Sequence, residues 1–304
     1  KKEKPSVAVL GPGVPEELIL ATGSVPYYIL GGSLKSEVWS DDLVPRDTDP
    51  VSRSLLGFLQ DPQGPDYSDT LFLVPATSDS MRKIAYLLKE QGRAVHIIDV
   101  PPQRDDGWEK WQTQMLRMTE AVAHHTHTHV SAYRLRSAIQ TVEAARQALR
   151  EFLTLTYDRE DLLTGPARLL VQNSYYDTKD LSLWTKQLLH LNDELQGRRR
   201  RYTPGRTNCP GILLMGSPVY FPNYKVPFLI QDIGLTVLGN IDVTSLKLQS
   251  RNILTGRGQR RETLIRAVAD RWYSEDGSPA YVVNEAMYQS AARCLKREQI
   301  EGVV

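Results

Sequence analysis

Four histidines lie close together in the middle of the chain, at His124, His125, His127 and His129. On a helix, His125 and His129 are four residues apart and could share a metal ion. No carboxylate accompanies them in a His-Glu-x-x-His pattern. They come just before Ser131, a good N-cap for the following helix. We therefore interpret these imidazoles as solvated or capping groups, with metal binding as the alternative.

Three other short patterns suggest chemistry but lack the context that it requires. The arginines at 198–201 could bind phosphate or nucleic acid, yet no aromatic residues are interleaved with them, so a solvated linker and no nucleic-acid partner are expected. Gly11 and Gly13, on either side of Pro12, lack the full spacing of a phosphate-binding loop and indicate a turn. Ser217, in Met-Gly-Ser-Pro, is not a nucleophile elbow. A cap for the next helix is the expected role of Ser217.

A further set of polar residues follows predicted strands directly. The loops at 11–15, 75–80, 216–223 and 240–245 should all lie at carboxyl ends of parallel strands, where ligands of such sheets bind. If the two sheets face each other, these loops would line a cleft. The lining would be rich in hydroxyl groups and suited to hydrogen bonding of a ligand rather than to acid–base chemistry. The predicted cleft residues are Gly11, Ser78, Asp79, Ser217, Tyr220, Asn223, Asp242 and Thr244.

The elements that position these loops repeat one pattern. A short apolar strand, a loop, an apolar-periodic helix and a second strand occur at 7–30, 70–100 and 212–238. Such crossovers connect parallel strands. A long helical stretch separates the second unit from the third, so two separate parallel sheets are expected. We predict an N-terminal α/β domain at 1–107, a helical connecting segment at 108–203 and a C-terminal α/β domain at 204–304.

Two stretches are expected to be irregular. Residues 41–65, rich in Asp, Pro and Ser, are interpreted as a surface segment around one or two helical turns. Residues 242–245, after the strand at 235–238, are interpreted as a loop. Helices are expected at 262–272 and 285–296, and a closing strand at 302–304.

Composition limits the class of protein. The 304 residues carry a formal net charge of +1, so no polyanionic partner is indicated. No apolar run is long enough to span a bilayer and no signal-peptide pattern opens the chain, so a cytoplasmic protein without a membrane partner is expected.

Cys209 and Cys294 are not in a metal-ligand spacing. The last residues resemble the start of a strand, and we expect the native chain to continue past Val304.

Several segments, in the same order, carry a resemblance to a known family. These segments cover nearly the whole chain and lie at 14–18, 21–26, 74–83, 98–101, 131–155, 163–165 and 213–218. In them the sequence resembles the subunits of 2-hydroxyacyl-CoA dehydratases and benzoyl-CoA reductases, and in particular the dehydratase D-component.

The resemblance implies two Rossmann-like α/β domains joined by helices, in a subunit that forms a heterodimer with a related subunit. Family subunits usually hold a [4Fe-4S] cluster through three cysteines, and a separate ATP-dependent activator supplies one electron. The implied reaction is a lyase reaction that eliminates water from a 2-hydroxyacyl-CoA through a ketyl radical, or the reduction of an aromatic acyl-CoA ring.

The sequence departs from this family at the positions where cysteine is often found. Gly has no side chain, and Ser and Thr hydroxyls do not bind iron as thiolates do. Cys209 precedes a predicted strand and Cys294 lies in a predicted helix, so neither is at a strand's carboxyl end. We therefore expect no cofactor held by cysteines of this chain. The positions that differ are Gly11, Ser78, Ser217 and Thr244.

Three functions remain open. The first is a cluster-less subunit with a binding or scaffolding role in a heteromeric complex, with an acyl-CoA as a possible ligand. The second is a catalytic dehydratase or acyl-CoA reductase subunit that uses a partner's iron–sulfur cluster. The third is an unrelated two-domain binding protein with a similar sheet topology.

Overall fold

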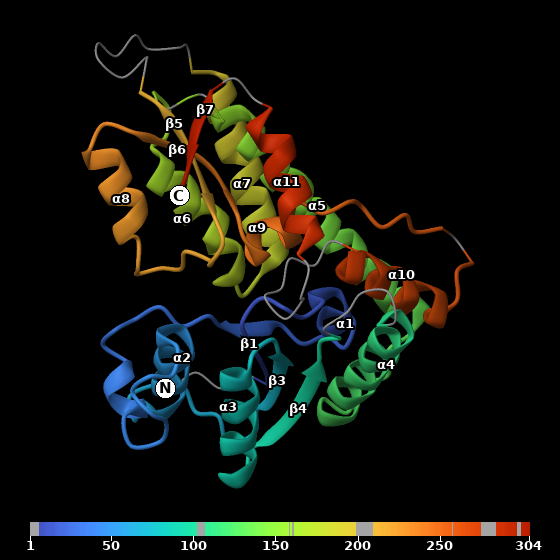
Figure 1. The fold of residues 1–304 in the computed structure, drawn as a ribbon. Helices are drawn as coiled ribbons and strands as arrows, with labels where there is room; N and C mark the ends of the chain where they lie inside the picture. The colour runs from blue at the N-terminus through green and yellow to red at the C-terminus, as the bar shows by residue number, and fades with distance from the viewer. Residues whose placement is uncertain are drawn as a thin grey trace. The chain divides into compact units, whose positions relative to one another are not determined.

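The computed structural model describes residues 6–101, 107–157, 159, 161–198, 209–256, 258–274, 284–296 and 299–304 (Figure 1). Two compact units form the chain. The first contains the residues up to Gln140 and Asn252–Ser274, and the second contains Thr141–Arg251 and Asn284–Val304. This grouping differs from the division expected from the sequence, because the helices after residue 107 are shared between the units.

The first unit is built on a four-stranded parallel sheet. Its strands follow the order β2-β1-β3-β4, and Val7 of β1 is paired with Pro26 of β2 and with Leu71 of β3. The predicted β-α-β units at 7–30 and 70–100 are therefore confirmed. The elements of this unit are β1 (Val7–Leu10), α1 (Glu16–Leu20), β2 (Pro26–Ile29), η1 (Glu37–Ser40), α2 (Pro50–Gln60), β3 (Leu71–Ala76), α3 (Asp79–Glu90), β4 (Ala94–Asp99), α4 (Trp108–His125) and α10 (Arg261–Ser274), with the start of α5 (Ala132–Thr156).

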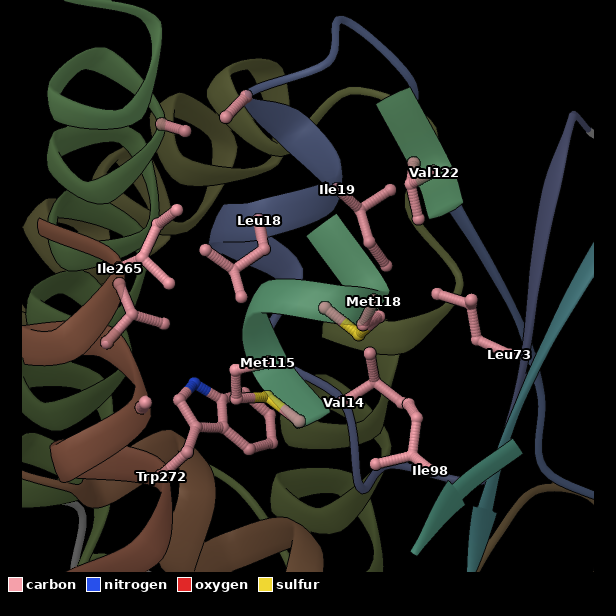
Figure 2. Packing of buried hydrophobic residues seen from close by; sticks show 14 of the residues in the cluster. Val14, Leu18, Ile19, Leu73, Ile98, Met115, Met118, Val122, Ile265 and Trp272 are labelled. Atoms are coloured by element: carbon pink, nitrogen blue, oxygen red, sulfur yellow. The ribbon is translucent and has the colours of Figure 1, made fainter. Parts of the chain in front are cut away.

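Helices bury both faces of this sheet, as the continuous apolar strands require. Val7 and Val9 point into a core formed with α1, α4 and α10, whereas Ala8 and Leu10 point into a second core formed with α2 and α3. Figure 2 shows the first core, in which side chains from α1, α4 and α10 meet the strand residue Leu73.

The second unit is built on a three-stranded parallel sheet with β5 in its centre, in the order β6-β5-β7. Ile212 and Leu214 of β5 pack on one side, with residues of α6 and α8, and Leu213 packs on the other, with residues of α9 and α11. The elements are α6 (Gly165–Asn173), η2 (Ser174–Tyr176), α7 (Leu181–Gln196), β5 (Gly211–Met215), α8 (Lys225–Asp232), β6 (Thr236–Ile241), α9 (Val243–Gln249), α11 (Glu285–Leu295) and β7 (Ile300–Val303), with the larger part of α5.

The fold class is confirmed: the protein is α/β, with two Rossmann-like parallel sheets and many helices. Two local expectations were wrong. Residues 242–245 are the N-cap and first turn of α9 rather than a loop, and α2 is a regular helix capped by Asp49, whose side chain accepts a hydrogen bond from the Ser52 amide at 2.9 Å. The arginines at 199–201 and the predicted loop at 275–279 lie outside the described residues. Among the described helices, none is long and apolar enough to cross a membrane.

Candidate functional site

The carboxyl edge of the first sheet brings the loop after β1 against the end of β3. The amide of Gly11 donates to the Ile29 carbonyl at 2.9 Å, which joins the ends of β1 and β2. Gly11 has a φ of +84°, a conformation that glycine adopts at little cost. A Cβ atom at Gly13 would lie 3.2 Å from the side chain of Pro75, so the loop and β3 are in close contact.

The first turn of α3 places two polar residues on the same edge. Ser78 is the N-cap of α3, and its Oγ accepts a hydrogen bond from the Met81 amide at 3.2 Å. Ser78 and Asp79 are both exposed. One turn further, Arg82 pairs with Asp99 at the end of β4, with 2.8 Å between Nη1 and Oδ1. The predicted site residues Gly11, Ser78 and Asp79 thus belong to one edge of one sheet.

In the second unit, the loop between β5 and α8 is held from two sides. The Gly216 amide donates to the Ile241 carbonyl at 3.0 Å, and the Asn173 amide group donates to the Val219 carbonyl at 2.6 Å. Ser217 and Asn223 are exposed in this loop. The expectation that Ser217 caps the next helix was wrong, because α8 begins only at Lys225 and has no side-chain cap.

Asp242 forms the centre of a buried hydrogen-bonded cluster at the end of β6. Its Oδ1 accepts from the amides of Thr244 at 2.8 Å and Ser245 at 2.9 Å, and also from the Thr244 hydroxyl. Its Oδ2 accepts from the Asn240 amide group at 2.8 Å. The Ser245 hydroxyl in turn accepts from the Asp242 amide at 3.0 Å, which completes a capping box. The carboxylate and the Thr244 hydroxyl therefore hold the start of α9.

Tyr220 lies near this cluster and is 6% exposed. Burial raises the pKa of its phenol well above the ordinary value of 10, and the negative charge of Asp242 raises that pKa further. The phenol is consequently neutral at physiological pH and can donate a hydrogen bond. The Tyr220 carbonyl accepts from the Asn223 amide at 2.8 Å. The structure thus brings Tyr220, Asn223, Asp242 and Thr244 together at one edge of the second sheet.

The eight predicted site residues form two groups, one in each unit. Both groups lie at carboxyl ends of strands, where the sequence placed them. A single cleft lined by both groups stays a prediction.

This architecture has a known counterpart. The model of a protein family described as 2-hydroxyglutaryl-CoA dehydratase, D-component, matches residues 13–304. The chain belongs to this family. It is also similar to the "Putative dehydratase subunit YjiM" of Escherichia coli (strain K12), with 24% identity over 297 residues, which are 96% of this chain and 75% of that protein. The chain is therefore a dehydratase-family subunit, as its sequence resemblance indicated.

The resemblance to this D-component family implies an iron–sulfur cluster, and the donor groups of this chain do not fit one. Thiolates hold such clusters. At the strand ends, the Ser78 and Thr244 hydroxyls are in helix-capping contacts. Cys209 lies before the amino end of β5, and Cys294 lies in α11. Neither thiol is at the edge where the other site residues lie.

The histidines lie where α4 ends. His124 and His125 are in its last turn, and Nε2 of His125 is 3.0 Å from the Asp69 carbonyl oxygen. His127 has a φ of 51° and follows the helix. In the part of the chain that the structure describes, no group of three or more His, Cys, Asp or Glu residues could hold a metal ion.

The sequence did not reveal two features of the structure. Glu17 and Arg271 form a buried ion pair in the first unit, and Nε1 of Trp272 donates to Glu17 at 3.1 Å. In the second unit, Arg168 and Gln172 of α6 line a cavity. The turn Thr164-Gly165-Pro166 predicted the start of α6, because Thr164 caps it and Pro166 is in its first turn, but nothing in the local pattern indicated a cavity.

Proposed function

We propose that the chain is a dehydratase-type subunit that binds ligand and supports a related partner subunit, while the partner holds the iron–sulfur cluster. The observation that carries this proposal is the set of donors at the strand ends. Ser78 and Thr244 present hydroxyls, Gly11 presents no side chain, and the two thiols lie elsewhere. Membership of the D-component family supports the role of a subunit.

The exposed polar positions support ligand binding. Ser78 and Asp79 at the start of α3, and Ser217 and Asn223 in the loop before α8, are accessible and offer hydroxyl, carboxylate and amide groups. These groups suit hydrogen bonds to the amide and carbonyl groups of an acyl-CoA chain. The negative charge of Asp79 disfavours binding of a phosphate at the start of α3. The pantetheine and thioester portions of acyl-CoA are thus the better match.

An apolar surface on α8 supports a partner subunit. Five large side chains on α8, in the loop before it and at its C-cap have exposed fractions between 45% and 67%, and the rings of Phe221 and Tyr224 are 6.2 Å apart between centroids. Exposed apolar patches of this kind mark protein–protein contacts. We assign this surface to the contact with the related subunit. Its residues are Phe221, Val226, Phe228, Leu229 and Ile233.

A second candidate function is catalysis by this chain on an acyl-CoA positioned beside the partner's cluster. The position of Tyr220 in the loop at the carboxyl end of β5 favours it, because a phenol there is a hydrogen-bond donor suited to a thioester carbonyl. In this case Tyr220→Phe would lower turnover of a 2-hydroxyacyl-CoA in the presence of an activator. Under the first proposal, the same variant would leave turnover unchanged in a complex that still assembles.

The test is anaerobic purification of the native complex, followed by native mass spectrometry and by iron and sulfide assays on each separated subunit. We expect iron with the partner and none with this chain. Stoichiometric iron and sulfide retained by this chain alone would refute the proposal.

Ser217→Ala and Asn223→Ala should weaken acyl-CoA binding without reducing stability. If the substitution Leu229→Asp leaves assembly with the partner intact, the interface assignment is wrong.

A further inference from the structure

A cavity of about 530 Å³ lies entirely within the second unit. Its volume is within the range of small-molecule sites, roughly 300–1,000 Å³. Residues of α5, α6, β6 and α11 contribute most of its lining. Gly165 at the start of α6 is one of them, and a Cβ atom there would lie 2.7 Å from Cβ of Val237. The absence of a side chain at Gly165 allows α6 to approach β6 at one wall of the cavity.

Among the described residues of the cavity wall, the charged groups are all positive. Arg150 and Arg168 line it, and no aspartate or glutamate is among its described lining residues. Arg168 is buried and donates to the carbonyls of Thr156 at 2.5 Å, Tyr157 at 2.8 Å and Val237. These contacts fix its position in the wall. The potential inside the cavity therefore favours an anion.

Arg150 is the more adaptable of the two arginines. It is half-buried, and it donates to the Ser250 carbonyl at 3.2 Å and to Oε1 of Gln147 at 2.9 Å. Burial is the largest cause that lowers its pKa, although Glu143 and Glu151 on the same helix act in the opposite direction. An anionic ligand beside Arg150 would offset this desolvation and form a charge-assisted hydrogen bond.

Gln172 provides an independent observation. It lines the same cavity and is only 1% exposed, yet its Nε2 has no hydrogen-bond acceptor within the described structure. A buried amide donor without an acceptor costs free energy, about 1–3 kcal/mol in typical proteins. A ligand oxygen in the cavity would accept this hydrogen bond.

The rest of the lining combines aliphatic side chains with polar ones such as Thr154 and Gln249, and the aliphatic part determines what else the ligand carries. Phosphate or sulfate alone would leave this surface in contact with water, whereas an alkyl chain would cover it. We propose that the cavity binds a small organic acid, with its carboxylate at Arg150 and Gln172 and a short alkyl chain against the aliphatic wall. The aliphatic lining residues are Leu153, Leu169, Leu213, Val237, Leu238 and Ile300.

This site is separate from the exposed strand-end groups assigned to acyl-CoA, and the inference does not depend on that proposed function. The test is isothermal titration of the full-length protein with hexanoate and with inorganic phosphate. Hexanoate should bind more tightly than phosphate. Arg150→Gln and Gln172→Met should each weaken hexanoate binding by about tenfold or more, as expected for loss of a hydrogen bond to a charged group.

Exposed residues of α7 in the same unit provide matched controls. Lys186→Gln removes a positive charge and Gln187→Met removes an amide outside the cavity, and both should leave hexanoate affinity unchanged. Gln172→Met should also preserve or raise the melting temperature of the ligand-free protein, because it removes a buried donor without an acceptor. The inference is overturned if the full-length protein does not bind hexanoate, if phosphate binds as tightly, or if Arg150→Gln and Gln172→Met retain the wild-type affinity.

Discussion

Replacement of Asp242 separates a structural role from a ligand-binding role at the second strand end. In the structure, the Asp242 side chain is 2% exposed and accepts hydrogen bonds from two backbone amides, one hydroxyl and one amide group. All four contacts are internal to the cluster at the start of α9. Asp242→Ala should therefore lower stability before it affects any ligand.

The magnitude follows from the contacts that are lost. Removal of an N-cap costs about 1 kcal/mol. The Thr244 hydroxyl, which is buried, would lose its acceptor, at a cost of about 1–3 kcal/mol. The Asn240 amide group is only half-buried, so water can replace its partner. The expected loss is about 3 kcal/mol in the free energy of unfolding, from these two terms.

Urea unfolding measures this loss. With a slope of about 2 kcal/mol/M, a loss of about 3 kcal/mol moves the midpoint by about 1.5 M. Trp184 is the one tryptophan in the sequence of the second unit, so its fluorescence in a variant with the other tryptophans replaced reports that unit alone. Hydrogen exchange should accelerate in α9. Asp242→Asn retains an acceptor oxygen, so its free energy of unfolding should decrease clearly less than that of Asp242→Ala.

The capping role would be refuted if Asp242→Ala shifted the urea midpoint by less than about 0.3 M and left hydrogen exchange in α9 unchanged. If Asp242→Ala lost acyl-CoA binding without this loss of stability, Asp242 would belong to the ligand site. Ser217→Ala is the matched control for stability alone: Ser217 is exposed, so this variant should leave the urea midpoint unchanged while it weakens acyl-CoA binding.

Three further predictions concern buried groups. Arg271→Met should cost about 3–5 kcal/mol in urea unfolding because the buried Glu17 loses its ion-pair partner, and adding Glu17→Gln should restore much of the lost stability. Gly165→Ala should cost about 1–3 kcal/mol, because the new Cβ would lie 2.7 Å from Cβ of Val237. The raised pKa of Tyr220 contributes stability that is complete below about pH 10 and decreases as the pH rises further. In Tyr220→Phe, this part of the decrease in alkaline stability should be absent.

The sequence predicted the sheets well because parallel strands buried on both faces are short apolar runs between glycines and prolines. The strand at 212–215 corresponds closely to β5, and the strand at 7–10 is β1. Helix α9 was missed because its first residues, Asp242 to Ser245, are of types that also favour turns. Their spacing was a capping signal with Ser in place of the usual Glu or Gln at the third helical position.

The site was predicted only as far as strand ends could be predicted. The positions of Ser78 and Asp242 after their strands follow from the topology, but their hydrogen bonds do not. Glu17 and Arg271 are 254 residues apart in the chain, and no local pattern links them. The cavity beside α6 depends on how helices from distant segments pack on β6, which only the folded chain determines.

The residues that stand at the expected cluster positions have structural uses of their own. Ser78 caps α3, and the Thr244 hydroxyl helps to hold the carboxylate that caps α9. Serine is among the preferred N-cap residues, so Ser78 stabilises the start of α3 without any bound metal. In this chain the edge of each sheet therefore gains helix-capping contacts at positions where the sequence resemblance led us to expect cysteine. This explains how the fold of a dehydratase subunit can be retained when these positions are not used for ligation.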